Sequence, residues 1–367
     1  MIDWVIFMKK ARKMSAAVVL IAAAALCTAA ADTVGAAVYA ALQRCLNIVI
    51  PSLFAMTVLS GLLIRSGTIA AAGRPVHRAG RLLFGMDGDI FLIFLFSCIA
   101  GYPVGARMLM GCFRSGRLTK RETELLTGVC FGAGPAFVCG CAAGQLYHSA
   151  HIGLLISISS AAGSIAAAAV LSVYLRRHSH GAPPHTSFSF STELLPECIS
   201  SAGRTMAEIC AAILGFAVIS ALLNLIGAIP AAAELLMRLT GRDFMTAAGL
   251  ICSALDVTAV AALPAGDFTL LPDIAALVTF GGGCVFVQLS AIFRGRLSLL
   301  PAVLIRLGAS AVSFAVCRLM LPLFIAGESV SAAAVKAHEA ASPVPSVILA
   351  VMTALVFAKY ERSRKKA

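Results

Sequence analysis

The chain has 367 residues, of which 60% are hydrophobic and 13% charged, and its mean hydropathy is +0.93. Soluble domains are less apolar and about 25% charged, so this composition excludes them and indicates an integral membrane protein. The net charge of +12 does not indicate nucleic-acid binding, because the basic residues lie in short loops between apolar runs. The twelve cysteines form no pair of CxxC motifs, so we predict neither a metal site nor a cofactor.

Ten apolar segments follow one another along the chain, and a helix needs about 20 apolar residues to cross a bilayer. The uninterrupted segments are Ala16–Ala31, Ile48–Ile64, Ile152–Leu175, Met206–Ile226, Leu299–Ile325 and Val344–Ala358. Four others carry Gly, Pro or a charge near the centre: Phe91–Phe113, Leu125–Tyr147, Phe244–Leu263 and Ile274–Phe293. We therefore predict an all-α integral membrane protein in the bacterial cytoplasmic membrane, and we expect the first segment to be a retained N-terminal helix.

The positions of Lys and Arg predict which loops are cytoplasmic. Basic loops stand both before Phe91–Phe113, at residues 65–81, and after it, at residues 114–121. Both loops agree with the positive-inside rule only if this segment enters the membrane and returns, as a re-entrant helical hairpin that turns at residues 100–106. Phe244–Leu263, entering from outside, gives a second re-entrant hairpin. Both termini are then cytoplasmic, and the few basic residues predicted outside include Arg44, Arg238 and Arg242.

The two halves of the chain resemble each other. Residues 43–67 align with residues 203–227, and "FGAGPAFV" (131–138) aligns with "FGGGCVFV" (280–287). The first copy starts outside and the second inside in the predicted topology, so the repeat is inverted. The predicted parts are an N-terminal membrane helix (1–41), a first repeat (42–175), a cytoplasmic linker (176–203), a second repeat (204–326), and a C-terminal helix with a basic cytoplasmic tail (327–367).

Four helix breaks are predicted, at "AGYPVGA" (100–106), "FGAGP" (131–135), "SALDVT" (253–258) and "FGGG" (280–283). Irregular backbone within a membrane persists only where protein or a water-filled cavity covers it, and secondary transporters place their substrate sites where broken helices meet. A half-helix that begins at Pro103 or Pro135 directs N–H groups toward an anion, and Arg107 strengthens that preference. Helix packing is the alternative for any single break.

Asp256 is the most distinctive single residue, because an ionisable group at membrane depth is a functional hypothesis by default. With Thr258 it could bind substrate or a coupling H⁺ or Na⁺. The alternative is that Asp256 only pairs with an arginine such as Arg107 or Arg306. Gln288 offers both a donor and an acceptor in the last broken segment, and Glu208 is expected to pair with Arg204 one helical turn away.

Three stretches carry a resemblance to a known family: "VIPSLFAMTVLSGLL", "AGYPVGARM" followed by "SGRLTKRE", and "FGAGPAFV". There the chain resembles the nucleoside-recognition (Gate) domain superfamily, and within it the sporulation integral membrane proteins of the YlbJ type. That family resembles concentrative nucleoside transporters in having two re-entrant hairpins, each followed by a broken helix. The resemblance implies a binding site formed by Gly101, Tyr102, Pro103, Gly105, Gly132, Gly134, Pro135, Asp256, Thr258, Gly281, Gly282, Gly283 and Gln288.

Proteins of the YlbJ type are associated with moving dipicolinic acid, an aromatic dicarboxylate, into the developing spore. The resemblance therefore implies a secondary or facilitative transporter of a small organic anion, not an enzyme, in the cytoplasmic or forespore membrane. The alternatives are a nucleoside or other small-solute transporter, and a non-transporting scaffold or receptor for spore assembly. The scaffold is supported by the apolar residues that replace expected polar ones, as at Ala259 and Phe286. Expected partners are the lipid bilayer, the anionic substrate, and a second copy or spore-assembly proteins.

Overall fold

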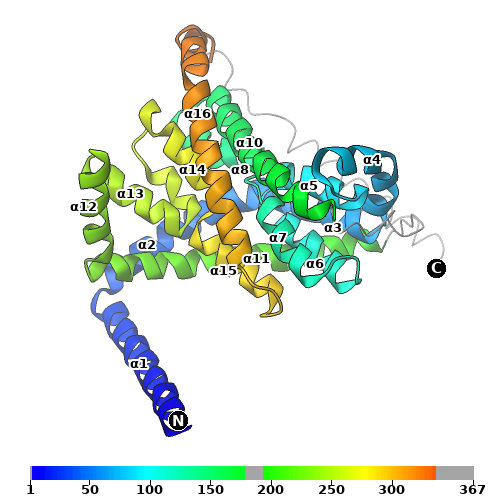
Figure 1. Cartoon of the computed structure of the whole chain (residues 1–367). Helices are drawn as coiled ribbons and strands as arrows, with labels where there is room; N and C mark the ends of the chain where they lie inside the picture. The colour runs from blue at the N-terminus through cyan, green and yellow to red at the C-terminus, as the bar shows by residue number, and fades with distance from the viewer. Residues whose placement is uncertain (1, 178–192, 336–367) are drawn as a thin grey trace, which may run out of the picture. The chain divides into compact units, whose positions relative to one another are not determined.

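The computed structural model describes residues 2–177 and 193–335, with side chains described for residues 14–177 and 193–324 (Figure 1). The described residues are helical and contain no strand. Five helical segments are long and apolar enough to cross a membrane: Ala31–Arg65, Ala150–Leu175, Leu194–Leu225, Phe268–Phe293 and Leu300–Phe324. The prediction of an all-α protein with several membrane helices is confirmed. The expected helix at Val344–Ala358 and the basic tail lie outside the described residues.

The chain forms two compact units, Met1–Leu321 and Pro322–Ala367. The first unit begins with α1 (Ile2–Ala29) and α2 (Ala31–Arg44), and α2 continues through a π-helical turn (Cys45–Val49) into α3 (Ile50–Arg65). Residues 31–65 therefore form one helical run. Arg44 lies in the middle of this run rather than in a loop.

Shorter helices complete the first half of the chain. They are α4 (Thr68–Phe84), α5 (Gly88–Ala100), α6 (Val104–Arg114), α7 (Lys120–Val129), α8 (Pro135–Val138), a π-helical turn (Cys139–Ala143), α9 (Gly144–Leu146) and the long α10 (Ala150–Leu175). The α5–α6 pair packs on α7 and α10 through a core that includes Phe94, Met108, Leu126 and Leu171.

The second half follows a similar order of long and short helices. It contains α11 (Leu194–Leu225), α12 (Ala228–Thr240), α13 (Phe244–Leu255), two short 3₁₀ helices (Val257–Ala262 and Phe268–Leu270), α14 (Leu271–Phe280), α15 (Gly282–Phe293) and α16 (Leu300–Val335). α16 passes from the first compact unit into the second at Pro322. In both halves, helices therefore stop within apolar sequence at the four positions where breaks are predicted.

Glycines fix the ends of two short helices that occupy matching places in the halves. α4 begins after Gly67 (φ 74°) and ends at Gly85 (φ 66°), and α12 begins after Gly227 (φ 79°) and ends at Gly241 (φ 71°). The left-handed conformation is accessible to glycine without steric cost, so it lets the chain turn sharply at each end. α4 and α5 are consequently bent by 79° relative to each other.

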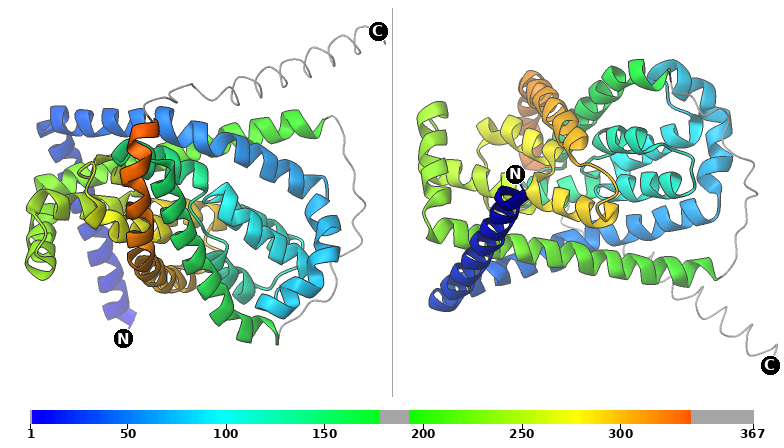
Figure 2. Two further views of the ribbon diagram at one scale, coloured as in Figure 1. Left: turned by 90° about the horizontal axis from the view of Figure 1, so that it is seen from above. Right: turned by 60° about the horizontal axis from the view of Figure 1, so that its bottom comes forward.

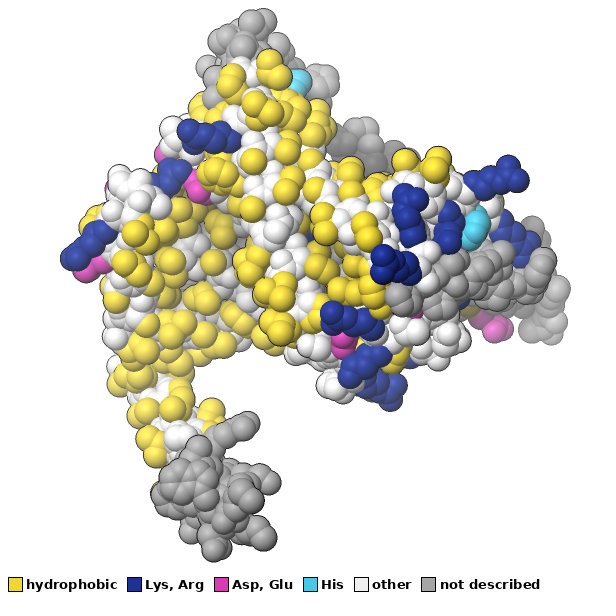
Figure 3. Space-filling model, viewed as in Figure 1, with side chains coloured by type: hydrophobic (Ala, Val, Ile, Leu, Met, Phe, Trp, Pro, Cys, Tyr) yellow, Lys and Arg dark blue, Asp and Glu magenta, His cyan; other side chains and the backbone are white. Residues whose placement is uncertain are grey.

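The long helices α3 and α11 lie side by side and antiparallel (Figure 2). Arg65, at the end of α3, binds Glu197 at the start of α11, with 2.6 Å between Nη1 and Oε2. Gly61, one turn earlier in α3, lies close to Cys198. Hydrophobic side chains cover much of the face seen in Figure 3, whereas Lys and Arg gather over the region of α4, α6 and α7.

The ends of the segment that contains α5 and α6 meet. Arg117, just after α6, donates through Nε to Asp89 at 2.9 Å and through Nη2 to Asp87 at 3.1 Å, and both carboxylates stand at the start of α5. The two helices thus form a hairpin that turns at residues 101–103. The second half contains a similar closure, because Arg242, just before α13, binds the Asp273 carboxylate and the Thr269 carbonyl oxygen near the start of α14.

Candidate functional site

The four helix breaks contact one another. A Cβ atom added to Gly101, in the first break, would lie 3.1 Å from the backbone nitrogen of Gly134 in the second. A Cβ on Gly282, in the fourth break, would lie 3.0 Å from the backbone nitrogen of Val257 in the third. A Cβ on Gly281 would lie 2.6 Å from the ring of Phe131. The breaks of the two halves therefore meet at one place.

Aromatic rings fill the space where the breaks meet. The Tyr102 and Phe131 ring centroids are 5.1 Å apart, and the Phe131 and Phe286 rings stack at 5.5 Å. Phe137 lies 6.0 Å from Tyr102, between ring centroids. The Tyr102 hydroxyl donates to the Val278 carbonyl oxygen at 3.4 Å. This cluster joins the first hairpin to the last broken helix across the two halves.

Asp256 is buried at the end of α13, and its partner is Arg44. One carboxylate oxygen of Asp256 accepts from the Thr258 hydroxyl at 2.7 Å, and the other accepts from the Thr258 N–H at 3.1 Å. Arg44 approaches that carboxylate to 3.8 Å and donates through Nε to the Thr258 hydroxyl at 3.2 Å. Asp256 thus has an arginine partner, as the alternative interpretation expected, but that arginine is neither Arg107 nor Arg306.

Three cavities lie in sequence between the surface and Asp256. The outermost is a cleft of about 400 Å³ formed by α3, α6, α11 and α15, with Arg65, Arg107, Arg114 and Arg294 among its lining residues. A smaller cavity of about 70 Å³ shares Arg107 with the cleft and continues to Gln288. The innermost cavity, about 20 Å³, shares Gln288 and is lined by Tyr102, Asp256 and Thr258. Its volume suffices for about one water molecule.

Arg107 stands where the cleft joins the next cavity. Its two terminal nitrogens donate to the Thr205 hydroxyl at 2.6 Å and to the Glu208 carboxylate at 2.7 Å. Glu208 thus binds Arg107 of the hairpin instead of Arg204 of its own helix. The Nε atom of Arg107 is buried and has no hydrogen-bond partner in the described part of the chain. One donor of this guanidinium is therefore unsatisfied beside the cleft.

Arg306, on α16, is fully buried among backbone carbonyl groups. It donates through Nε to the Thr279 carbonyl oxygen at 3.0 Å, and through Nη1 to the Ser164 hydroxyl at 3.1 Å and the Gly128 carbonyl oxygen at 3.4 Å. Gly128 and Thr279 stand at the C-terminal ends of α7 and α14, where carbonyl groups lose their helical partners and the dipole is negative. Arg306 therefore stabilises the backbone just before the second and fourth breaks.

The predicted binding residues fall into three groups. Tyr102, Pro103, Arg107, Asp256, Thr258 and Gln288 line the cavities. Pro135 is exposed at the first turn of α8. The seven predicted glycines lie where other atoms approach closely, and their role in binding stays a prediction. They are Gly101, Gly105, Gly132, Gly134, Gly281, Gly282 and Gly283.

Gly105 illustrates that packing. A Cβ there would lie 2.2 Å from the Cys130 carbonyl oxygen and 2.7 Å from the Ser97 Cβ atom. The absence of a side chain therefore lets the hairpin approach the second break.

Sequence reasoning missed the roles of Arg44 and Glu208. Their signal was the charge itself, since each lies in a long apolar helix and needs a partner. Arg44 pairs with Asp256, 212 positions away, and Glu208 pairs with Arg107, 101 positions away. Local sequence spacing cannot indicate partners at such separations. In the side chains that the structure describes, no group of three His, Cys, Asp or Glu could hold a metal ion.

No protein-family profile matches the chain, and no solved structure matches it. The chain is similar to the sporulation integral membrane protein YlbJ of Bacillus subtilis (strain 168), with 24% identity over 131 residues. That alignment covers 36% of this chain and 32% of the relative, so the match spans about a third of the curated protein. The similarity to a protein of the YlbJ type is thus confirmed, and the chain is a membrane protein with a sporulation-related relative.

Proposed function

We propose that this protein is a secondary or facilitative transporter of a small organic anion. The observation that carries the proposal is the arginine-lined cleft, which leads past Arg107 to the place where the four breaks meet. Four guanidinium groups line it, and one carboxylate, Glu208. Its volume of about 400 Å³ is within the roughly 300–1,000 Å³ of small-molecule sites. Guanidinium groups bind carboxylates through paired, charge-assisted hydrogen bonds.

Dipicolinate is the substrate that we propose first. It carries two carboxylates on an aromatic ring, so it matches both the arginines of the cleft and the aromatic cluster of Tyr102, Phe131 and Phe286. The Nε donor of Arg107 is buried and unsatisfied, so a bound carboxylate would accept from it after a shift of the Arg107 side chain. A neutral nucleoside has no carboxylate with which the four arginines could form charge-assisted hydrogen bonds. Asp256 with Thr258 is the proposed position for a coupling H⁺ or Na⁺.

We further propose that the two halves form an inverted repeat with two re-entrant hairpins. The antiparallel packing of α3 on α11 supports it, because these helices carry the aligned residues 43–67 and 203–227. The glycine-bounded α4 and α12 have matching places, and both hairpin segments are closed by an arginine at their base. Such repeats with broken helices at their interface are typical of secondary transporters.

A labelling experiment tests this topology. With Cys139, the one exposed native cysteine, replaced by Ser, Ser115→Cys should react with an impermeant maleimide only from the cytoplasmic side. Ala265→Cys should react only from outside. Both positions are exposed. Labelling of Ser115→Cys from outside would contradict the re-entrant hairpin and the inverted repeat together.

The transport proposal is tested by uptake of labelled dipicolinate into proteoliposomes, under H⁺ and Na⁺ gradients and without them. Arg107→Gln removes charge-assisted hydrogen bonds of about 1.5–3 kcal/mol, so we expect uptake at low substrate concentration to fall about 10–100-fold. Arg238→Gln is the matched control, because Arg238 is exposed on α12 and does not line the cleft. Equal uptake by both variants would contradict a role for the cleft.

The small inner cavity favours one alternative, a non-transporting scaffold or receptor for spore assembly. A volume of about 20 Å³ beside Asp256 admits no organic anion without a conformational change. Uptake assays with dipicolinate, other dicarboxylates and nucleosides separate the two functions. Folded wild-type protein that moves none of them, under any gradient, would exclude the transporter and favour the scaffold.

A further inference from the structure

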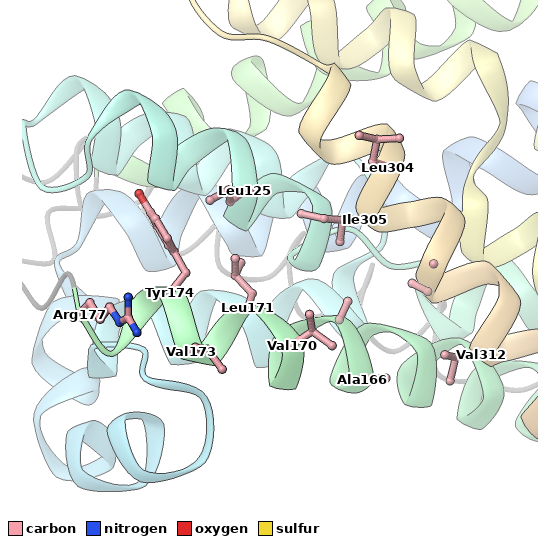
Figure 4. Close-up of a pocket in the computed structure, with 13 residues that line it drawn as sticks. Leu125, Ala166, Val170, Leu171, Val173, Tyr174, Arg177, Leu304, Ile305 and Val312 are labelled. Carbon is pink, nitrogen blue, oxygen red and sulfur yellow. The ribbon is translucent and has the colours of Figure 1, made fainter.

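A second, larger groove lies between α10 and α16 (Figure 4). Its volume is about 790 Å³, and it shares no lining residue with the cleft or the two inner cavities. Small residues create it, since Ala166 and Ala167 of α10 face Gly308 and Ala309 of α16. Larger side chains form its rims. The exposed fractions of Val170, Val173 and Leu304 are 79%, 64% and 59%.

The environment of the groove restricts what can occupy it. Both α10 and α16 are long and apolar enough to cross a membrane, so a groove that opens between them faces hydrocarbon, where a linear acyl chain is the abundant occupant. Apart from Tyr174 and Arg177, its lining side chains are all apolar or absent. The apolar lining of the groove therefore fits the acyl chain of a lipid.

The polar end of the groove indicates which lipid. Tyr174 and Arg177 lie together at the end of α10, beyond the apolar sticks of Val170 and Val173 in Figure 4. Arg177 is exposed, whereas its neighbour Arg176 donates to the Leu82 carbonyl oxygen at 2.6 Å. A guanidinium at the end of an apolar groove binds a phosphate oxygen with a charge-assisted hydrogen bond. Basic pockets between membrane helices recognise acidic headgroups in this way.

We propose that the α10–α16 groove binds an anionic phospholipid, with an acyl chain between Ala166 and Gly308 and the headgroup phosphate at Arg177. The site is independent of the proposed transport, because no cleft residue contributes to it. Arg177 is the second residue of the predicted cytoplasmic linker (176–203), so the proposed headgroup lies in the cytoplasmic leaflet, which is richer in anionic lipid.

Native mass spectrometry of the purified full-length protein tests the site. The protein is incubated in detergent with equal amounts of phosphatidylglycerol and phosphatidylcholine, and the lipid retained is counted. We expect the wild type to retain more phosphatidylglycerol than phosphatidylcholine. In Arg177→Ala the ratio of the two retained lipids should fall about fivefold, which is the effect expected of one basic side chain at a membrane surface. Arg177→Lys should keep most of it, which separates loss of charge from loss of fold.

Gly308→Leu adds a side chain to the lining of the groove, at a position where no atom lies within 4 Å of an added Cβ. It should reduce retention of both lipids. Gly215→Leu is the matched control, since Gly215 on α11 has equally open surroundings. Unchanged preference in Arg177→Ala together with unchanged retention in Gly308→Leu would overturn the proposal. A lipid-free dimer that Gly308→Leu converts to monomer would also overturn it, by identifying a second copy as the occupant.

Discussion

Removing Arg44 should expose the electrostatic cost of Asp256. The side chain of Asp256 is 5% exposed, and that of Arg44 is 21% exposed at a distance of 3.8 Å. Two unit charges at this distance attract by about 4 kcal/mol at an effective dielectric constant of about 20. Because Arg44 is partly open to its surroundings, we reduce this to about 2 kcal/mol.

The two single substitutions should therefore differ in their cost. Arg44→Met leaves a buried carboxylate held only by Thr258, whereas Asp256→Asn leaves an arginine whose long side chain can extend toward water. We expect Arg44→Met to be the more destabilising. The double variant should be less destabilised than the sum of the two single variants, with a coupling free energy of about 2 kcal/mol.

The assay is a double-mutant cycle on the free energy of unfolding, measured in mixed micelles by reversible denaturation. Arg238→Met is the control, because it replaces an exposed arginine by the same residue and should change the unfolding free energy by less than about 0.5 kcal/mol. Additive costs, with a coupling below about 0.5 kcal/mol, would refute the inference that Arg44 and Asp256 stabilise each other.

Two further predictions concern the backbone at the breaks. Arg306→Met should destabilise the protein by about 2–4 kcal/mol. Each buried carbonyl group left without a donor costs about 1–3 kcal/mol, and removal of the buried charge offsets part of that cost. Thermal unfolding followed by size-exclusion chromatography measures the destabilisation. Gly134→Ala should cost about 1–3 kcal/mol by overpacking, since its Cβ would lie 2.6 Å from the Ile99 carbonyl oxygen, and the same assay applies.

Each of these has a matched control. Arg318→Met replaces an exposed arginine on the same helix as Arg306, and Gly111→Ala adds a methyl group where no atom lies within 4 Å. If Arg306→Met unfolds at the temperature of Arg318→Met, the carbonyl groups of Gly128 and Thr279 do not depend on Arg306. A Gly134→Ala protein as stable as Gly111→Ala would contradict the close approach of the first two breaks.

The positions of the helix breaks could be predicted from sequence because their causes are local. Pro103 and Pro135 lack a donor, and Gly281 adopts a φ of 92° that other residues resist. What surrounds the glycines could not be predicted. A glycine that allows close backbone contact and a glycine that exposes an amide to ligand have the same local sequence. The structure shows close contacts around all seven predicted binding glycines, and their role in binding stays a prediction.

The partners of Arg44 and Glu208 also could not be predicted from the sequence. Arg44 stands between two apolar runs and is therefore predicted outside the membrane, yet the helix continues through a π-helical turn at Cys45–Val49. That continuity directs Arg44 toward Asp256. Glu208 has an arginine one turn away in its own helix, but the hairpin brings Arg107 to it instead. Tertiary contacts of this kind depend on how long helices cross, which no local pattern specifies.

Arg306 has a consequence for how the protein is assembled. The second break, at residues 131–135, is synthesised long before α16, whose Arg306 donates to the Gly128 and Thr279 carbonyl oxygens. During insertion the carbonyl groups at the end of α7 must therefore bind water or the insertion machinery. The first half therefore lacks a hydrogen-bond donor for these carbonyl groups until α16 has been inserted. A chain truncated before α16 contains all four breaks but not Arg306, and we expect membrane quality-control proteases to degrade it.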